Sequence, residues 1–257
     1  MNIKTLVIST LSKMPYLESI YERIMPIRSV NLENGHNLLF ASNNSLVKYR
    51  IETFFSKEPQ TLQWIDAFDK NAILFDIGAN IGLYSLYAGN LGLKVYSFEP
   101  DSLNFAVLNR NIHFNKLSNS VIAYNVALSN TETMGQIFTS QFMSGGSFHQ
   151  IDQKLQKDAS HLQGVVIQTL DKVAELLNVS INYLKIDVDG NEKNILLGAD
   201  KVLSSPELKS ILIEVEKIDD DENNELVLIL KKYGFKINEK HYLNDAKTTA
   251  NYILTKN

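Results

Sequence analysis

Short apolar runs alternate along the chain with longer stretches in which apolar residues recur every three or four positions. The short runs are typical of buried β-strands, and the longer stretches are typical of amphipathic helices. Strands are predicted near 73–76, 94–98, 120–126, 181–187, 211–216, 235–239 and 249–255. Helices are predicted near 80–91, 102–114, 170–178, 191–203 and 222–233. This alternation forms βαβ units, so the expected fold class is α/β, with a mostly parallel seven-stranded sheet flanked by helices.

The run 128–169 breaks the alternation. It contains the segments "SNTETMGQIFTS" and "MSGGSFHQ", which are rich in turn-forming residues. We expect an extra hairpin and a loop, inserted after the third strand. Because the two glycines of "MSGGSFHQ" favour mobility, Ser147 and His149 of this loop are candidates for lining a substrate pocket, with a surface histidine of no special role as the alternative.

Residues 1–70 precede the alternating pattern and are expected to form an N-terminal extension, helical or extended, that ends in a lid segment. The main domain is then 71–257. Near the N-terminus, six residues at spacings of three and four predict a helix with one apolar stripe: Val7, Leu11, Met14, Leu17, Tyr21 and Ile24. The preferred role of this stripe is to cover the domain core. The second is a contact in a homo-oligomer, and the third is binding to a membrane surface.

Composition and charge exclude several classes of function. Charged residues interrupt the N-terminal apolar run, and no stretch reaches the ~18 apolar residues of a transmembrane helix, so no such segment is expected. The formal charge is −4 and there is no long basic block, so nucleic acid is not an expected partner. The chain has no cysteine, which excludes disulfides and thiolate metal sites and suits a reducing, cytoplasmic location.

The stretch "LFDIGANIGLYS" at 74–85 joins the first predicted strand to the first predicted helix. The strand ends on an acid, Asp76, and the turn that follows holds Gly78 and Gly82. Glycines at these places allow a tight turn and a close approach of the backbone to a ligand. Glu99 ends the second strand, where a carboxylate can accept both hydroxyls of a ribose. The pattern therefore predicts a nucleoside pocket at the carboxyl ends of the strands.

The charge of Asp76 helps to decide which nucleoside binds. A dinucleotide site needs G-x-G-x-x-G and places a pyrophosphate over the turn, whereas here the spacing is Gly78-Ala-Asn-Ile-Gly82 and Asp76 would repel an anion. A G-x-x-x-x-G-K-[ST] motif is also missing, which disfavours nucleoside triphosphates. The cationic sulfonium and ammonium groups of S-adenosylmethionine would instead be attracted. The alternatives are an NAD-dependent oxidoreductase and a non-catalytic nucleoside-binding or scaffold module.

A second acidic group follows a later strand, in "LKIDVDGNE". Asp187 ends that strand, so its carboxylate must be solvated, paired or functional. One interpretation makes Asp187 or Asp189 a general base that takes a hydroxyl proton, which requires a raised pKa. The other has both residues, with Glu216, bind a divalent cation that orients a diol. The base is preferred, because Asp189 could simply cap a helix in a capping box with Glu192.

The ordered set of motifs resembles the FkbM-type methyltransferases, which are S-adenosylmethionine-dependent enzymes of the class I, Rossmann-like fold. The similarity runs from about Tyr49 to Glu216 and is carried by "ETFFSKEPQTLQWI", "FDIGANIGLYS", "VYSFEPDSLNFAVLNRNI", "NVALSN", "LDK", "LKIDVDGNEKNILLGA" and "IEVE". It implies methyl transfer to an oxygen, often on a sugar, a glycan or a glycosylated natural product. Acceptors vary widely across such a family, so the reaction and the cofactor carry over better than the acceptor does.

The resemblance also implies which residues hold the cofactor. They come from the turn, the ribose acid, the adenine side and the end of the third strand: Asp76, Gly78, Ala79, Asn80, Gly82, Glu99, Pro100, Asn104, Asn125, Val126 and Ala127. Glu58 and Thr61 of "KEPQT" resemble a lid over the methionine end, although Pro59 could equally make them the start of a helix.

The remaining site residues concern the chemistry and the acceptor. Asp187 and Asp189 are the candidate catalytic residues, and a divalent cation bound to them is the less favoured alternative. Ser147, His149 and Glu216 are weaker candidates for contacting a hydroxyl acceptor.

Overall fold

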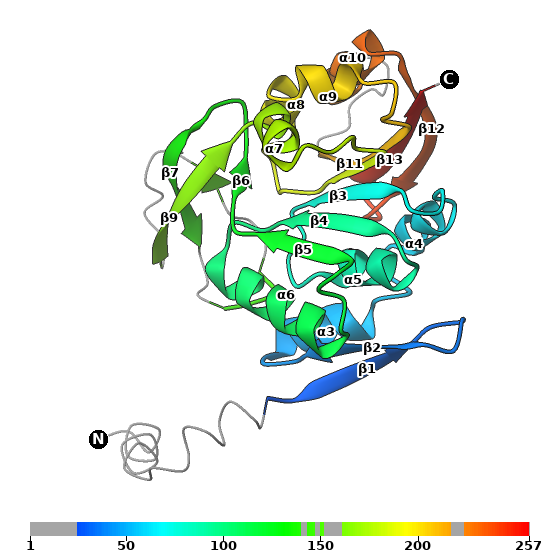
Figure 1. Ribbon diagram of the computed structural model, residues 1–257, viewed down its shortest axis with the longest axis vertical. Helices are drawn as coiled ribbons and strands as arrows, with labels where there is room; N and C mark the ends of the chain where they lie inside the picture. The colour runs from blue at the N-terminus through cyan, green and yellow to red at the C-terminus, as the bar shows by residue number, and fades with distance from the viewer. Residues whose placement is uncertain (1–24, 140–142, 147–149, 152–160, 217–223, 257) are drawn as a thin grey trace.

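A sheet of seven strands crosses the molecule (Figure 1). The computed structural model describes residues 25–139, 143–146, 150–151, 161–216 and 224–256. In spatial order the strands are β12 (Phe235–Tyr242), β13 (Thr249–Lys256), β11 (Ser210–Glu216), β10 (Tyr183–Ile186), β3 (Ile73–Ile77), β4 (Lys94–Phe98) and β5 (Val121–Tyr124). The strands from β11 to β5 pair in parallel, and β13 runs antiparallel to both of its neighbours. The predicted α/β fold, with a mostly parallel seven-stranded sheet, is confirmed.

Helices cover both faces of this sheet (Figure 1). One layer holds α4 (Pro59–Asp66), α5 (Leu83–Asn90) and α6 (Ser102–Phe114), and the other holds α7 (Leu170–Leu177), α8 (Glu192–Leu197), α9 (Asp200–Ser204) and α10 (Glu225–Lys232). Successive side chains of a strand point to opposite faces of the sheet, so each strand contributes side chains to the hydrophobic core on both faces. Leu74 packs in the hydrophobic cluster of α4–α6, whereas Phe75 packs in that of α7–α10. No helix in the described part of the chain is long and apolar enough to cross a membrane.

One row of side chains on the α4–α5 face of the sheet is polar. Lys185 of β10 lies beside Asp76 of β3, which lies beside Ser97 of β4, and all three are buried. Nearer the carboxyl edge, Glu214 of β11 lies opposite Asn251 of β13. Polar groups therefore replace the apolar core where the parallel strands end, which is the edge at which such sheets bind ligands.

The chain before β3 forms a hairpin and two helices. The hairpin strands β1 (Ile27–Asn31) and β2 (Asn37–Ala41) are antiparallel, and α3 (Ser45–Glu52) follows them. Two asparagines, one in α6 and one at its C-terminal cap, bind the free edge of β2. Asn111 Oδ1 accepts the amide hydrogen of Ala41, and Asn115 Oδ1 accepts that of Leu39, both at 2.8 Å. The predicted helix over the first residues lies outside the described part of the chain, and the boundary near residue 70 stays a prediction.

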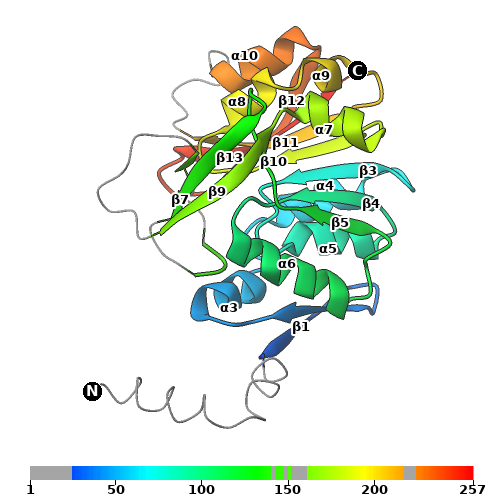
Figure 2. The same cartoon turned by 60° about the vertical axis from the view of Figure 1, so that its left-hand side comes forward.

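The run after β5 forms a second, four-stranded sheet beside the first (Figure 2). Its strands, in the order β6-β9-β7-β8, are β6 (Ala127–Leu128), β9 (His161–Gln168), β7 (Thr133–Thr139) and β8 (Gln150–Ile151). Strands β7 and β9 are antiparallel, as expected of an inserted hairpin. Ser147 and His149 lie outside the described residues.

The first helix after β3 begins at Leu83, later than the predicted start near 80. The reason is the backbone of the preceding turn: Asn80 has a φ of 51° and Gly82 has a φ of 87°. Both values are left-handed, and an α-helix of L-residues does not contain them.

The single helix predicted near 191–203 is two helices, α8 and α9, with a break at Gly198. A Cβ on Gly198 would lie 2.3 Å from the carbonyl oxygen of Ser129, so the chain passes too close to its neighbour for any side chain. The new helix has its own cap, because the carboxylate of Asp171 accepts the amide hydrogens of Lys201 and Val202 at 2.9 Å.

Candidate functional site

Two glycines shape the turn between β3 and α5. Gly78 has a φ of 80°, and a Cβ there would lie 1.9 Å from the carbonyl oxygen of Asp187. Gly82 has a φ of 87°, and a Cβ there would lie 2.3 Å from Cδ1 of Leu108 on α6. Both positions therefore need glycine for the backbone conformation and for space. The turn brings β3, β10 and α6 together at the carboxyl edge of the sheet.

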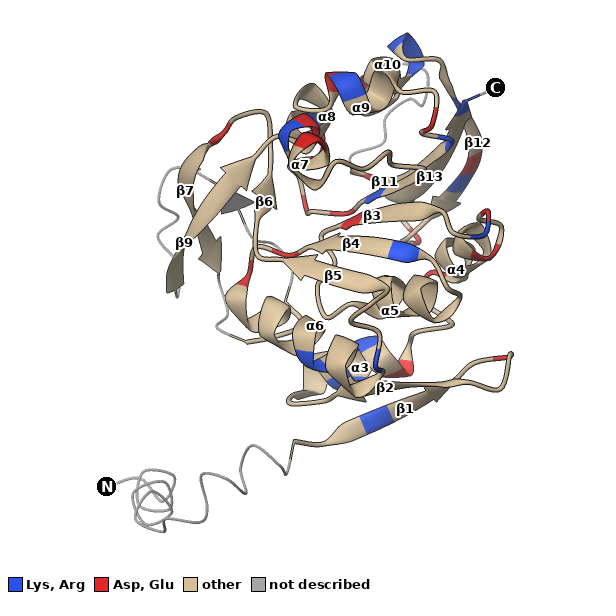
Figure 3. Ribbon diagram, in the orientation of Figure 1, with Lys and Arg blue, Asp and Glu red and all other residues tan. Residues whose placement is uncertain are grey.

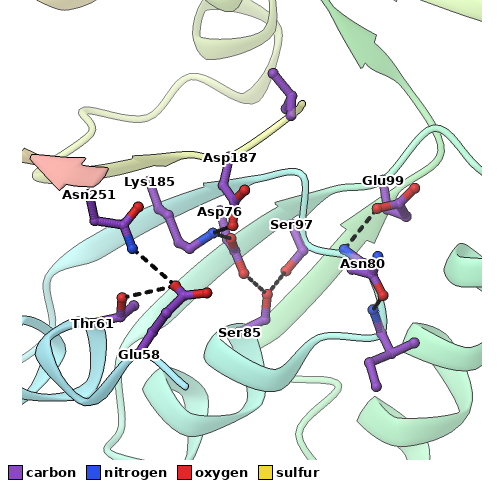
Figure 4. Close-up of polar contacts among 12 residues, drawn as sticks. Glu58, Thr61, Asp76, Asn80, Ser85, Ser97, Glu99, Lys185, Asp187 and Asn251 are labelled. Carbon is purple, nitrogen blue, oxygen red and sulfur yellow. Dashed lines mark hydrogen bonds and ion pairs between the residues drawn. The ribbon is translucent and has the colours of Figure 1, made fainter. Parts of the chain in front are cut away.

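Glu99 lies at the end of β4, beside this turn (Figure 4). Its Oε2 accepts the amide hydrogen of Asn80 at 2.7 Å, and its Oε1 accepts that of Asp101 at 2.9 Å. Burial raises the pKa of Glu99 to about 8, although the two backbone amides act in the opposite direction. The amides fix the orientation of the carboxylate and leave lone pairs on both oxygens for further donors, such as the hydroxyls of a ribose.

A small cavity of about 60 Å³ adjoins Glu99. Several of the residues predicted to hold the adenosine line it together: Gly78, Asn80, Glu99, Pro100, Val126 and Ala127. Asn125 supports this wall from its own strand end, because its Nδ2 donates to the carbonyl oxygens of Glu99 and Pro100, each at 2.8 Å.

Residues 143–146 lie against the same turn. The carbonyl oxygen of Gly146 accepts from Nδ2 of Asn80 at 2.7 Å and from Nδ2 of Asn104 at 3.1 Å. Gly145 donates its amide hydrogen to Oδ1 of Asn104 at 2.6 Å, and its carbonyl accepts from Nε of Arg50 at 2.6 Å. Asn104, expected on the adenine side, is therefore buried and uses its amide group to anchor this segment. The glycines that we expected to give mobility are held by four hydrogen bonds.

A buried lysine below the turn joins two aspartates (Figure 4). Nζ of Lys185 lies 2.7 Å from Oδ2 of Asp187 and 3.9 Å from Oδ1 of Asp76. Burial alone would lower the pKa of Lys185, but the carboxylates of Asp187, Asp76 and Glu58 outweigh it and raise this pKa above its ordinary value. Sequence reasoning missed Lys185, because one lysine in "YLKI" reads only as an interruption of an apolar strand. One feature of the sequence could have identified it: Lys185 lies two residues before Asp187, and residues two apart on a strand point to the same face of the sheet.

Asp76 lies under the turn, buried with Lys185. Its Oδ2 accepts from the hydroxyl of Ser85, which itself accepts from the hydroxyl of Ser97 at 2.8 Å. Burial raises the pKa of Asp76, and its Oδ1 has no hydrogen-bond partner among the described residues. Direct contact of Asp76 with a cofactor stays a prediction.

Asp187 occupies the junction of the small cavity and a larger one, and it lines both. Its side chain is 27% exposed. Burial would raise the pKa of Asp187, but the ion pair with Lys185 dominates and lowers it below its ordinary value. The raised pKa that we expected for a general base at this position is therefore wrong.

The larger cavity has a volume of about 320 Å³ and two chemically different walls. The carboxyl ends of β10 and β11 supply an acidic wall: Asp187, Asp189, Glu214 and Glu216. Figure 3 shows an acidic segment where β3 ends. The other group of lining residues includes Arg50 and Lys57 from the N-terminal extension and Tyr84 from α5. Burial raises the pKa of Glu214, and the negative charges of Asp187 and Asp189 add to this effect.

Glu58 is the N-cap residue before α4 and also lines the larger cavity. Its Oε2 accepts from Nδ2 of Asn251 at 3.1 Å and from the hydroxyl of Thr61 at 3.4 Å, and its Oε1 lies 3.0 Å from Nζ of Lys57. Glu58 therefore lies directly before the first residue of α4, whereas Thr61 is fully buried and supports Glu58. Contact of Glu58 with the cofactor stays a prediction.

Asp189 lines both cavities but does not cap α8. The residue before the helix is Asn191, and the carboxylate of Glu192 accepts the amide hydrogens of Val188 and Gly190 at 3.1 Å. The predicted capping box is therefore wrong, because Glu192 ties down the loop and not the helix end. In the described part of the chain no group of three or more His, Asp and Glu residues could hold a metal ion.

These features fit S-adenosylmethionine. Gly78 and Asn80 line the small cavity, and Glu99 offers an oriented carboxylate there to a ribose. The buried carboxylates of Asp76 and Glu58 offer negative charge to a cationic sulfonium and ammonium. A pyrophosphate would be repelled at the same place.

Comparison with known proteins agrees with this chemistry. A family model described as the methyltransferase FkbM domain matches residues 76–237, which is more than half of the chain. The chain is 24% identical over 191 residues to the 31-O-demethyl-FK506 methyltransferase FkbM of Streptomyces tacrolimicus, covering 64% of this chain and 73% of that one. It is 27% identical over 152 residues to methyltransferase 1 of Beauveria bassiana, covering 52% of this chain and 60% of that one.

Among solved structures, the magnesium protoporphyrin IX methyltransferase of Synechocystis, determined with S-adenosylmethionine bound, shares the fold with a TM-score of 0.50 and 11% identity. The match covers 100% of this chain and 98% of that one. The family match supports a methyltransferase over the NAD-dependent oxidoreductase and the non-catalytic module considered from the sequence. The chain belongs to the FkbM methyltransferase family and is an S-adenosylmethionine-dependent methyltransferase of the class I, Rossmann-like fold.

Proposed function

We propose that the enzyme methylates a hydroxyl group of a polyhydroxylated acceptor, such as a sugar, a glycan or a glycosylated natural product. The observation that carries this proposal is the acidic wall of the larger cavity, formed by Asp187, Asp189, Glu214 and Glu216. Ionised carboxylates only accept hydrogen bonds, and hydroxyl groups are suitable donors to them. The name of the Streptomyces relative, 31-O-demethyl-FK506 methyltransferase, refers to a substrate of that protein that lacks a methyl group on oxygen.

The two cavities would bind different parts of the reactants. Gly78, Asn80 and Glu99 would hold the adenosine half of the cofactor, and Glu58 would face its methionine half. When bound, S-adenosylmethionine supplies a methyl group whose bond to sulfur breaks as the acceptor oxygen bonds to the carbon. The protein mainly has to align the acceptor oxygen with this group and to remove one proton. Asp187 lines both cavities, so we assign it to orienting the acceptor hydroxyl.

We assign the proton to Glu214. A carboxylate that is paired with a buried ammonium is a weak base, and Asp187 is paired in this way with Lys185. Glu214 faces the same cavity, burial raises its pKa, and none of the described Lys, Arg or His residues forms an ion pair with it. The O–H bond of the acceptor would break toward this carboxylate as the new C–O bond forms.

Methyl transfer to a chemically sorted panel tests the proposed acceptor class. Labelled S-adenosylmethionine is incubated with the enzyme and with sugars, glycosides, simple alcohols, amines and carbon acids, and the products are analysed by mass spectrometry. We expect label on the oxygen of sugars or glycosides. Transfer to amines or carbon acids, with none to any hydroxyl compound, would contradict the proposal.

Substitution of the acidic wall tests the role of Glu214. With the acceptor found in the panel, Glu214→Gln should lower turnover by ~10²–10⁴-fold and leave S-adenosylmethionine affinity unchanged, because only proton removal is lost. The matched control is Glu207→Gln, an exposed carboxylate that lines neither cavity, which should stay within a few-fold of the parent. If Asp187→Asn strongly lowers turnover while Glu214→Gln keeps full activity, the general base is Asp187 and not Glu214.

A further inference from the structure

Lys185 is a buried cation in a site that has to receive a cationic cofactor. Its side chain is 1% exposed, and it lines the larger cavity from the floor of the sheet. Nζ lies 2.7 Å from Oδ2 of Asp187 and 5.2 Å from the ring centroid of Tyr84. In the described part of the chain, no other Lys or Arg forms an ion pair with Asp187 or Asp76.

Neutralising the nearby carboxylates does not by itself explain why a buried lysine is present at this site. Its ammonium weakens the negative field of Asp76, Glu58 and Asp187, so its charge alone disfavours a sulfonium nearby. A buried ammonium also loses its hydration, which is costly unless the group has good partners. The geometry provides a different reason for its presence. The Lys185 contact occupies Oδ2 of Asp187, and Oδ1 of Asp187 has no hydrogen bond within the described residues.

We propose that Lys185 is a positioning residue: its ammonium group fixes the Asp187 carboxylate through Oδ2, so that Oδ1 faces the junction of the two cavities. The junction is where the acceptor oxygen and the methyl group must meet, because Asp187 lines both cavities. The inference rests on the proposed function in assigning Asp187 to that meeting point. Without Lys185, Asp187 would be free to turn away or to take up a proton.

Two cofactor analogues can test this proposal without any acceptor. Sinefungin carries an ammonium group in place of the methyl sulfonium, whereas S-adenosylhomocysteine is neutral at its sulfur. The ratio of their dissociation constants therefore reports on a carboxylate that faces the transferred group. We expect the parent to prefer sinefungin and Asp187→Asn to reduce this preference about tenfold, the loss of one charge-assisted hydrogen bond.

The Lys185→Met variant separates positioning from charge by the sign of its effect. If Lys185 positions Asp187, this variant also loses about tenfold of the preference. If Lys185 acts only as a positive charge, its removal should increase the preference for the cationic analogue, and that result would overturn the proposal. The control is Lys209→Met, which breaks an ion pair of the same 2.7 Å length, with Asp69, at the solvent-exposed surface, and should leave the preference unchanged.

A double variant keeps the test valid if an unpaired Asp187 impairs folding. Lys185→Met combined with Asp187→Asn removes both members of the buried pair. If Lys185 acts only through Asp187, the double variant and Asp187→Asn should show the same preference within about threefold. A larger difference between them would overturn the proposal. Because both measurements use ligand binding alone, an acceptor other than a hydroxyl compound would not alter either result.

Discussion

At the scale of single residues, the carboxylates of the site differ in whether a cation lies beside them. Asp187 has Lys185 at 2.7 Å, and its pKa is lowered. Glu99 is buried and Glu214 is half-buried, neither has such a partner among the described residues, and desolvation raises the pKa of each. Neighbouring acids are thereby pushed toward opposite protonation states, which is how one site can hold a hydrogen-bond acceptor and a proton acceptor together.

The raised pKa of Glu99 predicts that cofactor binding depends on pH. Ribose hydroxyls bind best to the ionised carboxylate, whereas in the free protein Glu99 has a pKa of about 8 and is mostly protonated below that value. Binding below pH 8 must therefore release a proton. We expect S-adenosylmethionine affinity, measured by calorimetry, to rise up to about tenfold per pH unit between pH 6 and 8 and to level off above.

Glu99→Gln provides the control for this pH dependence. The variant should bind the cofactor more weakly, and its affinity should change less between pH 6 and 8. The stability of the free protein should change with pH in the opposite direction, decreasing as the pH rises. A carboxyl group with a raised pKa in the folded state stabilises the fold at low pH and loses this contribution as the pH rises through about 8. A parent protein whose affinity is constant from pH 6 to 8 would show that Glu99 is already ionised.

The location of a residue could be predicted where its position in the chain fixes its geometry, while its contact with the cofactor stays a prediction. Gly78 and Glu99 are recognisable because a turn with close backbone contacts and a strand-end acid leave a pattern in the sequence. Lys185 and Glu214 were not assigned a role, since their importance comes from neighbours on other strands. The sequence shows that Lys185 and Glu214 alternate with apolar residues along their strands. It does not show that β10 pairs with β3 and β11. The protonation of Asp187 was misjudged for the same reason.

At the scale of elements, the turn after β3 connects the cofactor site to β10 through a backbone contact. Gly78→Ala should strongly reduce S-adenosylmethionine binding, because its Cβ would lie 1.9 Å from the carbonyl oxygen of Asp187 and would force β3 and β10 apart. Calorimetry with the cofactor measures the binding, and circular dichroism checks that the variant is folded.

Gly92→Ala is the matched control for this substitution. Gly92 has a φ of 88°, close to the 80° of Gly78, but a Cβ there would meet no atom within 4 Å. Both variants pay the cost of a left-handed alanine, roughly 1 kcal/mol, and only Gly78→Ala adds the steric clash. Equal binding by the two variants would mean that the cofactor does not depend on this turn.

The strands of the main sheet could be predicted closely, since each is a short apolar run bounded by turn residues. The failures lie where one element is interrupted by contact with another. The helix break at Gly198 results from the approach of Ser129, and its new N-terminus is capped by Asp171 from α7. No local pattern encodes such contacts, so a continuous helix was the natural prediction.

At the scale of the whole molecule, the extension before β3 and the sheet share one hydrophobic cluster. Phe40, Val47 and Ile51 of the extension are buried in the same cluster as Leu86 and Leu108 of α5 and α6. The ring nitrogen of Trp64 also donates to the hydroxyl of Ser210 on β11, at 2.9 Å. The extension further supplies Arg50, Lys57 and Glu58 to the wall of the larger cavity. From these contacts we expect the extension to be required for the fold and for the site.

Two truncations test this dependence. A fragment that begins at residue 71 loses the partners of α5, α6 and β11, and each large side chain left exposed costs about 1.5–3 kcal/mol. A few such losses equal the roughly 5–15 kcal/mol that stabilises a typical domain, so we expect no cooperative thermal unfolding and no S-adenosylmethionine binding. A fragment that begins at residue 25 keeps every residue that lines the two cavities. It should unfold cooperatively and bind the cofactor with the affinity of the full chain, and any change should concern its oligomeric state. A folded, cofactor-binding 71–257 fragment would instead establish residues 1–70 as a separable appendage.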